Sequence, residues 1–160
     1  MATIKAINNV VTHHYGYTVP YGNDTTLGYY LKTNSTGALL NADTTDAPQA
    51  NDVIDLGVLP EGWCLTDAQV IITEGLTATV TGSLGFVYED GEDDADIPQD
   101  AEYFIKAGAD LATAGRLRAD GSKLVVLPKP ARLILTIDGA ANAKAAELYV
   151  TVSGELTGAR

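Results

Sequence analysis

Short stretches in which apolar and polar residues alternate recur along the chain from residue 53 onward. The two clearest are Ala131–Asp138 and Ala146–Ser153, in which every second side chain is apolar. Alternation with a period of two is typical of a β-strand with one buried face and one face in water. Six further segments show the same pattern between Gly, Pro, Asn or Asp residues: 53–58, 67–73, 76–81, 83–88, 101–106 and 123–127.

Helical periodicity is weak by comparison. Ala140–Glu147 is rich in alanine but lacks a long apolar stripe, and Asp110–Arg118 has a large apolar residue only near each end. Strands that alternated with helices of about 10–15 residues would favour a parallel sheet, and that pattern is absent. Short strands with regular turn signals instead predict an all-β fold, and their polar faces favour an antiparallel β-sandwich over residues 51–160.

The first fifty residues have a different composition, rich in Thr, Asn, Gly and Tyr, with too few aliphatic residues to form a core of their own. One interpretation is a loosely packed extension with one or two strands, at Thr3–Val11 and Leu27–Lys32. The other is an extended N-terminal arm, residues 1–50, that docks on a neighbouring molecule through tyrosines, which combine rigid area with a polar tip. The candidate contact residues are Tyr15, Tyr17, Tyr21, Tyr29 and Tyr30.

Length and charge narrow the class of partner. The chain has 160 residues, which suits one domain without disulfides or metals, and carries 10 Lys and Arg against 21 Asp and Glu, a net charge of −11. This balance argues against binding to nucleic acid or to anionic lipid, because both need basic residues. No secretory signal and no apolar run of about 18 residues are visible, so we expect synthesis in the cytoplasm and no membrane partner.

Residues 89–102 form an acidic stretch with eight carboxylates and no Lys or Arg. Hard cations such as Ca²⁺ prefer several carboxylate oxygens, so one interpretation is a weak cation site at Asp90, Glu92, Asp94 and Asp96. The helix–loop–helix calcium consensus fails, since Ala95 stands where Gly is required. The alternative is a solvated connection between two strands, which is the usual role of a charge run.

Candidate catalytic chemistry is sparse. Cys64 is the single cysteine and is expected to be a small buried apolar residue, without a disulfide. His13 and His14 are adjacent, so on a strand they would point to opposite faces and could not share a metal ion. No Gly-x-Ser-x-Gly nucleophile motif and no glycine-rich phosphate loop occur. The sequence therefore predicts no catalytic residue, no catalytic metal and no cofactor.

A series of short pieces, in this order and spacing, resembles a known family. The pieces are Val53–Pro60, Glu61–Trp63, Leu84–Phe86, Ala101–Phe104, Ala112–Arg116, Leu127–Lys129 and Tyr149–Glu155. Together they resemble the capsid decoration (cement) proteins of tailed bacteriophages over about the last two-thirds of the chain. The resemblance implies a jelly-roll β-sandwich that binds the outside of the capsid shell as a homo-oligomer, a dimer or a trimer, with the major capsid protein as its partner.

The sequence thus predicts a structural virion protein without enzymatic activity, located on the capsid exterior. Its acidity would keep many copies soluble and apart before assembly. The first alternative is a carbohydrate- or receptor-binding β-sandwich of a phage fibre or spike, and the second is an enzyme on a β-sandwich scaffold. A fold alone does not decide between these functions.

Overall fold

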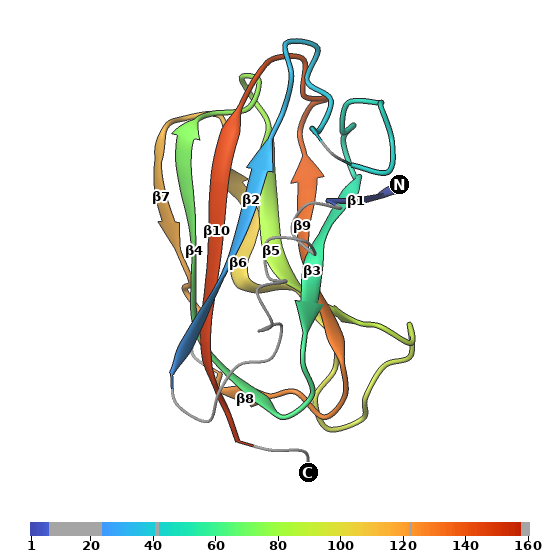
Figure 1. Cartoon of the computed structure of the whole chain (residues 1–160), viewed down its shortest axis with the longest axis vertical. Helices are drawn as coiled ribbons and strands as arrows, with labels where there is room; N and C mark the ends of the chain where they lie inside the picture. Colours follow the sequence, from blue (N-terminus) through green and yellow to red (C-terminus); the bar gives the residue numbers. More distant parts are fainter. Residues whose placement is uncertain (7–23, 41, 122, 158–160) are drawn as a thin grey trace.

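A computed structural model describes residues 1–6, 24–40, 42–121 and 123–157, and within these ranges the chain forms ten β-strands and no helix (Figure 1). The strands are β1 (Thr3–Lys5), β2 (Thr25–Lys32), β3 (Val53–Leu59), β4 (Trp63–Glu74), β5 (Thr81–Tyr88), β6 (Asp100–Asp110), β7 (Gly115–Arg118), β8 (Val125–Val126), β9 (Ala131–Asp138) and β10 (Glu147–Leu156). No helix capable of crossing a membrane occurs in the described part of the chain.

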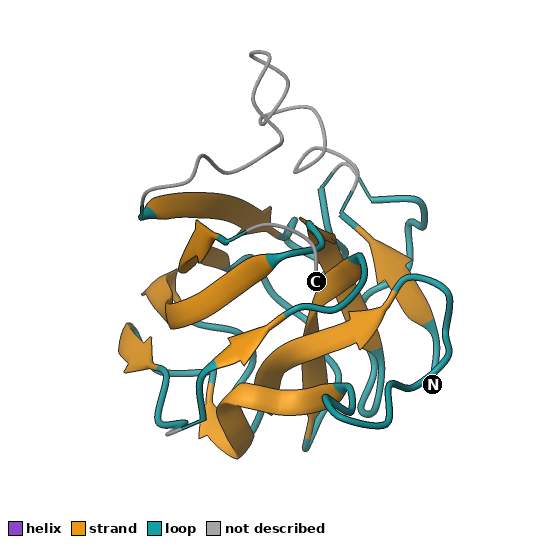
Figure 2. Ribbon diagram, turned by 90° about the horizontal axis from the view of Figure 1, so that it is seen from below, coloured by secondary structure: helices purple, strands orange, loops and turns teal. Residues whose placement is uncertain are grey.

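The strands form two sheets that pack face to face as a β-sandwich (Figures 1 and 2). One sheet has the order β1-β3-β9-β5-β6, and the other has the order β2-β10-β4-β7, with β8 paired to β4 further along that strand. All pairs are antiparallel except β1 with β3. The predicted all-β sandwich is confirmed.

Consecutive strands mostly alternate between the two sheets, as they do in a jelly roll. β2, β4, β7, β8 and β10 belong to one sheet, whereas β1, β3, β5, β6 and β9 belong to the other. Apart from β5 and β6, neighbours within a sheet therefore come from separate parts of the chain. The last strand, β10, lies between β2 and β4 and pairs with both along most of its length.

The core lies between the sheets and takes every second side chain from each strand. In β9 the inward residues are Leu133, Leu135 and Ile137, and each is at most 1% exposed. In β10 the corresponding residues are Leu148, Val150 and Val152, which are fully buried. Cys64 is buried next to Trp63 at the start of β4, as predicted. Burial of these alternating faces is the main stabilising force, at roughly 1.5–3 kcal/mol for a large apolar side chain.

Strands from the first fifty residues are part of the sandwich. β1 pairs with β3 and buries Ile4, and β2 pairs with β10 and buries Leu27 and Leu31 in the shared core. Because β1 joins one sheet and β2 the other, the two sheets include strands from both sides of the predicted boundary at residue 50.

Some predicted elements differ from the structure. The segment 76–81 was expected to be a strand, but residues 77–79 form a turn, with Thr79 at a φ of 73°. Leu76 and Val80 are both buried, so the apolar alternation there reflects two residues that anchor a turn. The weak helical candidate at 110–118 contains β7 instead, since β4 offers this segment a strand to pair with.

Candidate functional site

The tyrosines chosen as contact residues separate into three groups. Tyr15, Tyr17 and Tyr21 lie outside the described residues, as do His13 and His14. Tyr29 and Tyr30 are consecutive on β2, so their side chains point to opposite faces of the sheet.

Tyr29 is a core residue. Its side chain is 1% exposed, and its hydroxyl donates a hydrogen bond to the carbonyl oxygen of Val58 at 3.2 Å. Burial raises the pKa of this phenol well above its ordinary value. In this fold Tyr29 offers no surface to a partner, and its role is to fill the space above Gly57, where a β-carbon would lie 2.7 Å from its ring.

Tyr30 lies on the outer face of the sheet and is 44% exposed. The strand register places Tyr30 directly opposite Tyr149 of β10. Tyr149 is in turn opposite Ile71 of β4, and Ile71 is opposite Arg116 of β7. Directly opposed residues in antiparallel strands share a face, so these four side chains form one row across the sheet. We call Tyr30, Tyr149, Ile71 and Arg116 the tyrosine row.

Two features hold the tyrosine row in place. The Tyr30 hydroxyl donates a hydrogen bond to Glu147, which raises the pKa of Tyr30 and lowers the pKa of the Glu147 carboxyl. Tyr149 lies over Gly28, where a β-carbon would meet its hydroxyl oxygen at 1.9 Å. Tyr149, at 40% exposure, was not among the predicted contact residues, although the alternation of its strand places it on the wet face.

Residues 89–99 of the acidic stretch form the connection between β5 and β6, as its interpretation as a link between two strands predicts, and its last three residues begin β6. Lys129 anchors it, because its Nζ lies 2.7 Å from an Asp90 carboxylate oxygen and donates to the Glu92 carbonyl at 2.7 Å. The hydrogen bond from Lys129 lowers the pKa of Asp90. The same ammonium group lies 4.6 Å from the centre of the Tyr88 ring. Burial and the neighbouring loop carboxylates raise the pKa of Tyr88 to about 12.

Other carboxylates of this loop accept hydrogen bonds from its own backbone. Asp93 accepts from the Gln99 amide at 2.7 Å, and Asp94 accepts from the amides of Asp96 and Ile97. Within the described residues, no group of three or more His, Cys, Asp or Glu side chains is arranged to hold a metal ion. The cation site at Asp90, Glu92, Asp94 and Asp96 stays a prediction from the sequence.

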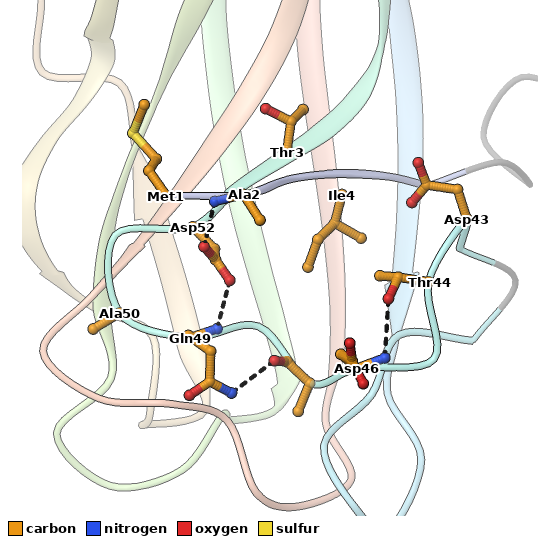
Figure 3. A pocket seen from close by; sticks show the side chains of 11 residues that line it. Met1, Ala2, Thr3, Ile4, Asp43, Thr44, Asp46, Gln49, Ala50 and Asp52 are labelled. Carbon is orange, nitrogen blue, oxygen red and sulfur yellow. Dashed lines mark hydrogen bonds between the residues drawn. The ribbon is translucent and has the colours of Figure 1, made fainter.

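A hollow with a volume of about 700 Å³ lies between β1 and the loop 43–52 (Figure 3). Asp52 accepts hydrogen bonds from the Ala2 amide at 2.6 Å and the Gln49 amide at 3.0 Å, which lower its pKa. Asp43 accepts from the Lys5 amide at 3.0 Å. These two carboxylates fasten β1 to the loop, and the described residues of the lining include no histidine, cysteine or lysine.

Comparisons with known proteins bear on the fold. No protein-family model and no curated protein matches the sequence. Among solved structures, a chain in the capsid of Ralstonia phage GP4 matches with a TM-score of 0.58 and 19% identity, covering 88% of this chain and 90% of that one. A chain in the cyanophage Pam1 capsid asymmetric unit matches with a TM-score of 0.58 and 16% identity, covering 85% and 86%.

The same sandwich fold occurs in two phage capsids. The shared part covers almost the whole of each chain, so it includes both sheets and not an isolated hairpin. At 16–19% identity the likeness concerns the fold, and the residues of any contact surface have to be argued from this chain alone.

Proposed function

We propose that the protein is a structural component of a phage virion that binds the outer surface of the head as a decoration protein and stabilises the shell. The observation that carries the proposal is the fold shared with two phage capsid chains over 85–88% of this chain. The sequence resemblance to decoration proteins points the same way independently. The major capsid protein is the proposed partner, and self-association as a dimer or trimer belongs to the same proposal.

The surface chemistry is compatible with an exterior position. The net charge of −11 keeps copies apart in solution and gives little attraction to the DNA inside the head. The tyrosine row supplies an exposed aromatic patch on a rigid sheet, which is the kind of surface that protein–protein contacts favour. We propose Tyr30 and Tyr149 as contact residues, together with Tyr15, Tyr17 and Tyr21 of the N-terminal segment.

The test begins with purified virions of the phage that encodes the chain. We expect the chain in these particles at a copy number comparable to that of the major capsid protein, by quantitative mass spectrometry. Heads assembled without it should bind the purified protein in a sedimentation assay, and the bound protein should raise the temperature at which the heads release DNA. Absence from virions, or presence only in tail fibres, would contradict the proposal.

Contact residues should be tested by substitution and not by deletion. Deletion of residues 1–30 would remove β1 and most of β2, whose side chains lie in the core. The variants are Tyr15→Ser/Tyr17→Ser/Tyr21→Ser and Tyr30→Ser/Tyr149→Ser. We expect each to sediment less with heads at an unchanged melting temperature. The matched control is Val58→Ser, which alters a side chain 43% exposed on the other sheet and should bind normally.

A further inference from the structure

β7 is a free edge of the sandwich. Within the described part of the chain it is the last strand of its sheet and pairs with β4 alone, and it lies at the outer margin on the left of Figure 1. Its four residues are exposed or half-buried. A free edge presents unpaired backbone groups to which an extended segment of another chain can add.

The register shows which backbone groups face outward. The Ala119 amide donates to the Ala68 carbonyl at 2.8 Å, so Ala119 and Ala68 form a hydrogen-bonded pair. Such pairs alternate along antiparallel strands, and Leu117 is therefore the next residue bonded to β4. The N–H and C=O groups of Arg116 and Arg118 point away from β4, and no described residue pairs with them.

The two arginines of this edge are only loosely engaged by their neighbours. An Arg116 Nη atom lies 3.4 Å from the Gln69 side-chain oxygen, and an Arg118 Nη atom lies 3.5 Å from an Asp67 carboxylate oxygen. The Arg118 side chain is 67% exposed. An antiparallel contact between two β7 edges would bring four guanidinium groups together, and like charges placed opposite each other are unfavourable. The edge therefore fits an acidic strand and not a second copy of itself.

A pocket lies next to this edge, where β4 passes from β7 to β8. It has a volume of about 120 Å³ and is lined by Leu65 and Thr66 of β4, Tyr103 and Phe104 of β6, and Ala119, Gly121, Lys123 and Leu124. Leu124 is 66% exposed, which is unusual for a leucine in this molecule. The Tyr103 hydroxyl donates to the Lys123 carbonyl at 2.6 Å and fixes one wall. An apolar side chain of a strand added to β7 would lie within reach of this pocket.

We propose that the β7 edge is a docking site for an extended, acidic segment of a partner protein. The partner backbone pairs with Arg116 and Arg118, its acidic side chains lie beside the two guanidinium groups, and one apolar side chain enters the pocket beside Leu124. Main-chain pairing gives affinity in this mode, while the charges and the pocket give specificity. The proposal does not depend on the capsid role, because it concerns a surface that the isolated chain presents.

The test uses the whole chain and a fluorescein-labelled nonapeptide in which Glu alternates with Val and Leu stands at both ends. We expect fluorescence anisotropy to detect binding, with NMR shift changes confined to the amides of Arg116, Arg118, Tyr103 and Leu124 and their neighbours. Arg116→Glu/Arg118→Glu should weaken binding at least about tenfold, and Leu124→Ser several-fold. The matched control, Lys5→Glu/Lys144→Glu, makes the same change of charge at exposed sites elsewhere and should bind normally.

Two peptide variants separate strand addition from simple charge attraction. A version N-methylated at alternate residues keeps every side chain but loses amide donors, and it should bind at least about tenfold more weakly. A version with Lys in place of Glu should not bind. The proposal is overturned if the acidic peptide does not bind at millimolar concentration, if it binds the Arg116→Glu/Arg118→Glu variant equally, or if N-methylation has no effect. Single-stranded DNA serves as a competitor for the labelled peptides. If it displaces the parent peptide and the N-methylated peptide equally well, the proposal is likewise rejected, in favour of a general polyanion site.

Discussion

Thr79 has a backbone conformation that is unfavourable for its residue type. It lies in the turn between β4 and β5 at a φ of 73°, a left-handed conformation that β-branched residues rarely adopt. The turn packs closely against Gly139, because a β-carbon added at Gly139 would lie only 2.2 Å from the Thr79 carbonyl oxygen. Such a position costs on the order of 1–3 kcal/mol, which the surrounding structure offsets.

Thr79→Gly should therefore stabilise the protein by about 1 kcal/mol, since glycine adopts this conformation without a steric clash. The melting temperature should rise by about 2–4 °C in calorimetry. Asn51→Gly is the control, because Asn51 has a φ of 68° but is a residue type that tolerates it, and the change there should be smaller. A lower melting temperature for Thr79→Gly would contradict the assignment of strain.

Tyr29 and Tyr30 are adjacent in the sequence, but one is a core residue and the other is exposed. The composition of the segment does not distinguish the two. Both were grouped as arm residues because they lie in a tyrosine-rich segment with few aliphatics. The alternation of Leu27, Tyr29 and Leu31 identifies a buried face, and it is visible in the sequence. The partners of that face could not be found in the same way, because they come from β10 and from the other sheet.

At the scale of elements, Asn142 joins the loops at one end of the sandwich. Its side-chain amide is buried and donates to the carbonyls of Gly37 and Lys144 at 3.0 and 2.9 Å. Its side-chain oxygen accepts from the Thr77 amide and hydroxyl, each at 3.1 Å. A single side chain thus connects three loops that are distant in sequence, and each of its polar atoms has a partner.

Asn142→Ala should destabilise the protein by about 2–4 kcal/mol, because it leaves buried carbonyl groups without donors. Urea unfolding followed by circular dichroism measures this change. Asn34→Ala is the matched control, since Asn34 accepts three hydrogen bonds within its own turn, two of them at exposed positions. Water can replace part of that loss, so a cost of about 1 kcal/mol is expected. Equal costs for the two variants would contradict a special role for Asn142.

β1 is attached to its sheet partly through ionised carboxylates, so its stability should depend on pH. Hydrogen bonds from the Ala2 and Gln49 amides hold the pKa of Asp52 below that of the unfolded chain. A lowered folded pKa means that the stabilisation is complete above the unfolded value, near 4, and is lost as the pH falls through the folded pKa. The protection factors of the Ile4 and Ala6 amides, which are their hydrogen-exchange rates corrected for the intrinsic rate at each pH, should fall below about pH 4.

Asp52→Asn should remove most of this dependence. The neutral amide keeps one acceptor oxygen but loses the charge-assisted hydrogen bonds, so we expect a cost of about 1–2 kcal/mol at pH 7. The protection factor of the Ile4 amide should then be lower at pH 7 and change little as the pH falls. Asp46→Asn, in the same loop but exposed, should leave the parent behaviour intact. A parent-like pH profile in Asp52→Asn would contradict the role of this carboxylate.

The sequence predicted elements well where one face of a strand is buried along its whole length. β3, β5, β9 and β10 were identified within a few residues, since each is an apolar segment bounded by turn residues, although consecutive residues of β3 and β5 are buried. β7 was not identified, because Gly115–Arg118 has one half-buried apolar residue and owes its conformation to pairing with β4. β6 was found but underestimated in length, since its register against β5 shifts twice and its exposed half has no apolar pattern.

At the scale of the whole molecule, the acidic loop is solvent-facing, and its charge is partly engaged by Lys129 and by backbone amides. We therefore expect 2 mM Ca²⁺, measured against an EDTA control, to shift the melting temperature by less than about 1 °C. A rise of several degrees that is lost in Asp90→Asn/Asp94→Asn would instead establish the cation site predicted from the sequence. Glu61→Gln/Glu74→Gln, which removes two acidic groups elsewhere, is the charge-matched control.

The tyrosine row and the β7 edge could be predicted only in part from the sequence, because both depend on which strands are neighbours in the sheet. The tyrosine row takes one residue from each of four strands, β2, β10, β4 and β7, whose order in the sheet is unrelated to their order in the chain. Sequence reasoning could assign Tyr149 to the wet face of its strand but could not place it beside Tyr30. The β7 edge could not be predicted without knowing that β4 pairs with Gly115–Arg118.

The placement of β10 between β2 and β4 has a consequence for how the chain folds. Until residue 156 has left the ribosome, β2 has no described neighbour in its sheet, and β4 lacks one of its two sides. Most stabilising contacts join segments far apart in sequence. Such topologies fold slowly, in milliseconds to seconds, because long loops must close before these contacts form. The sandwich should therefore form only after β10 has emerged, which leaves the exposed apolar strands to chaperones until then.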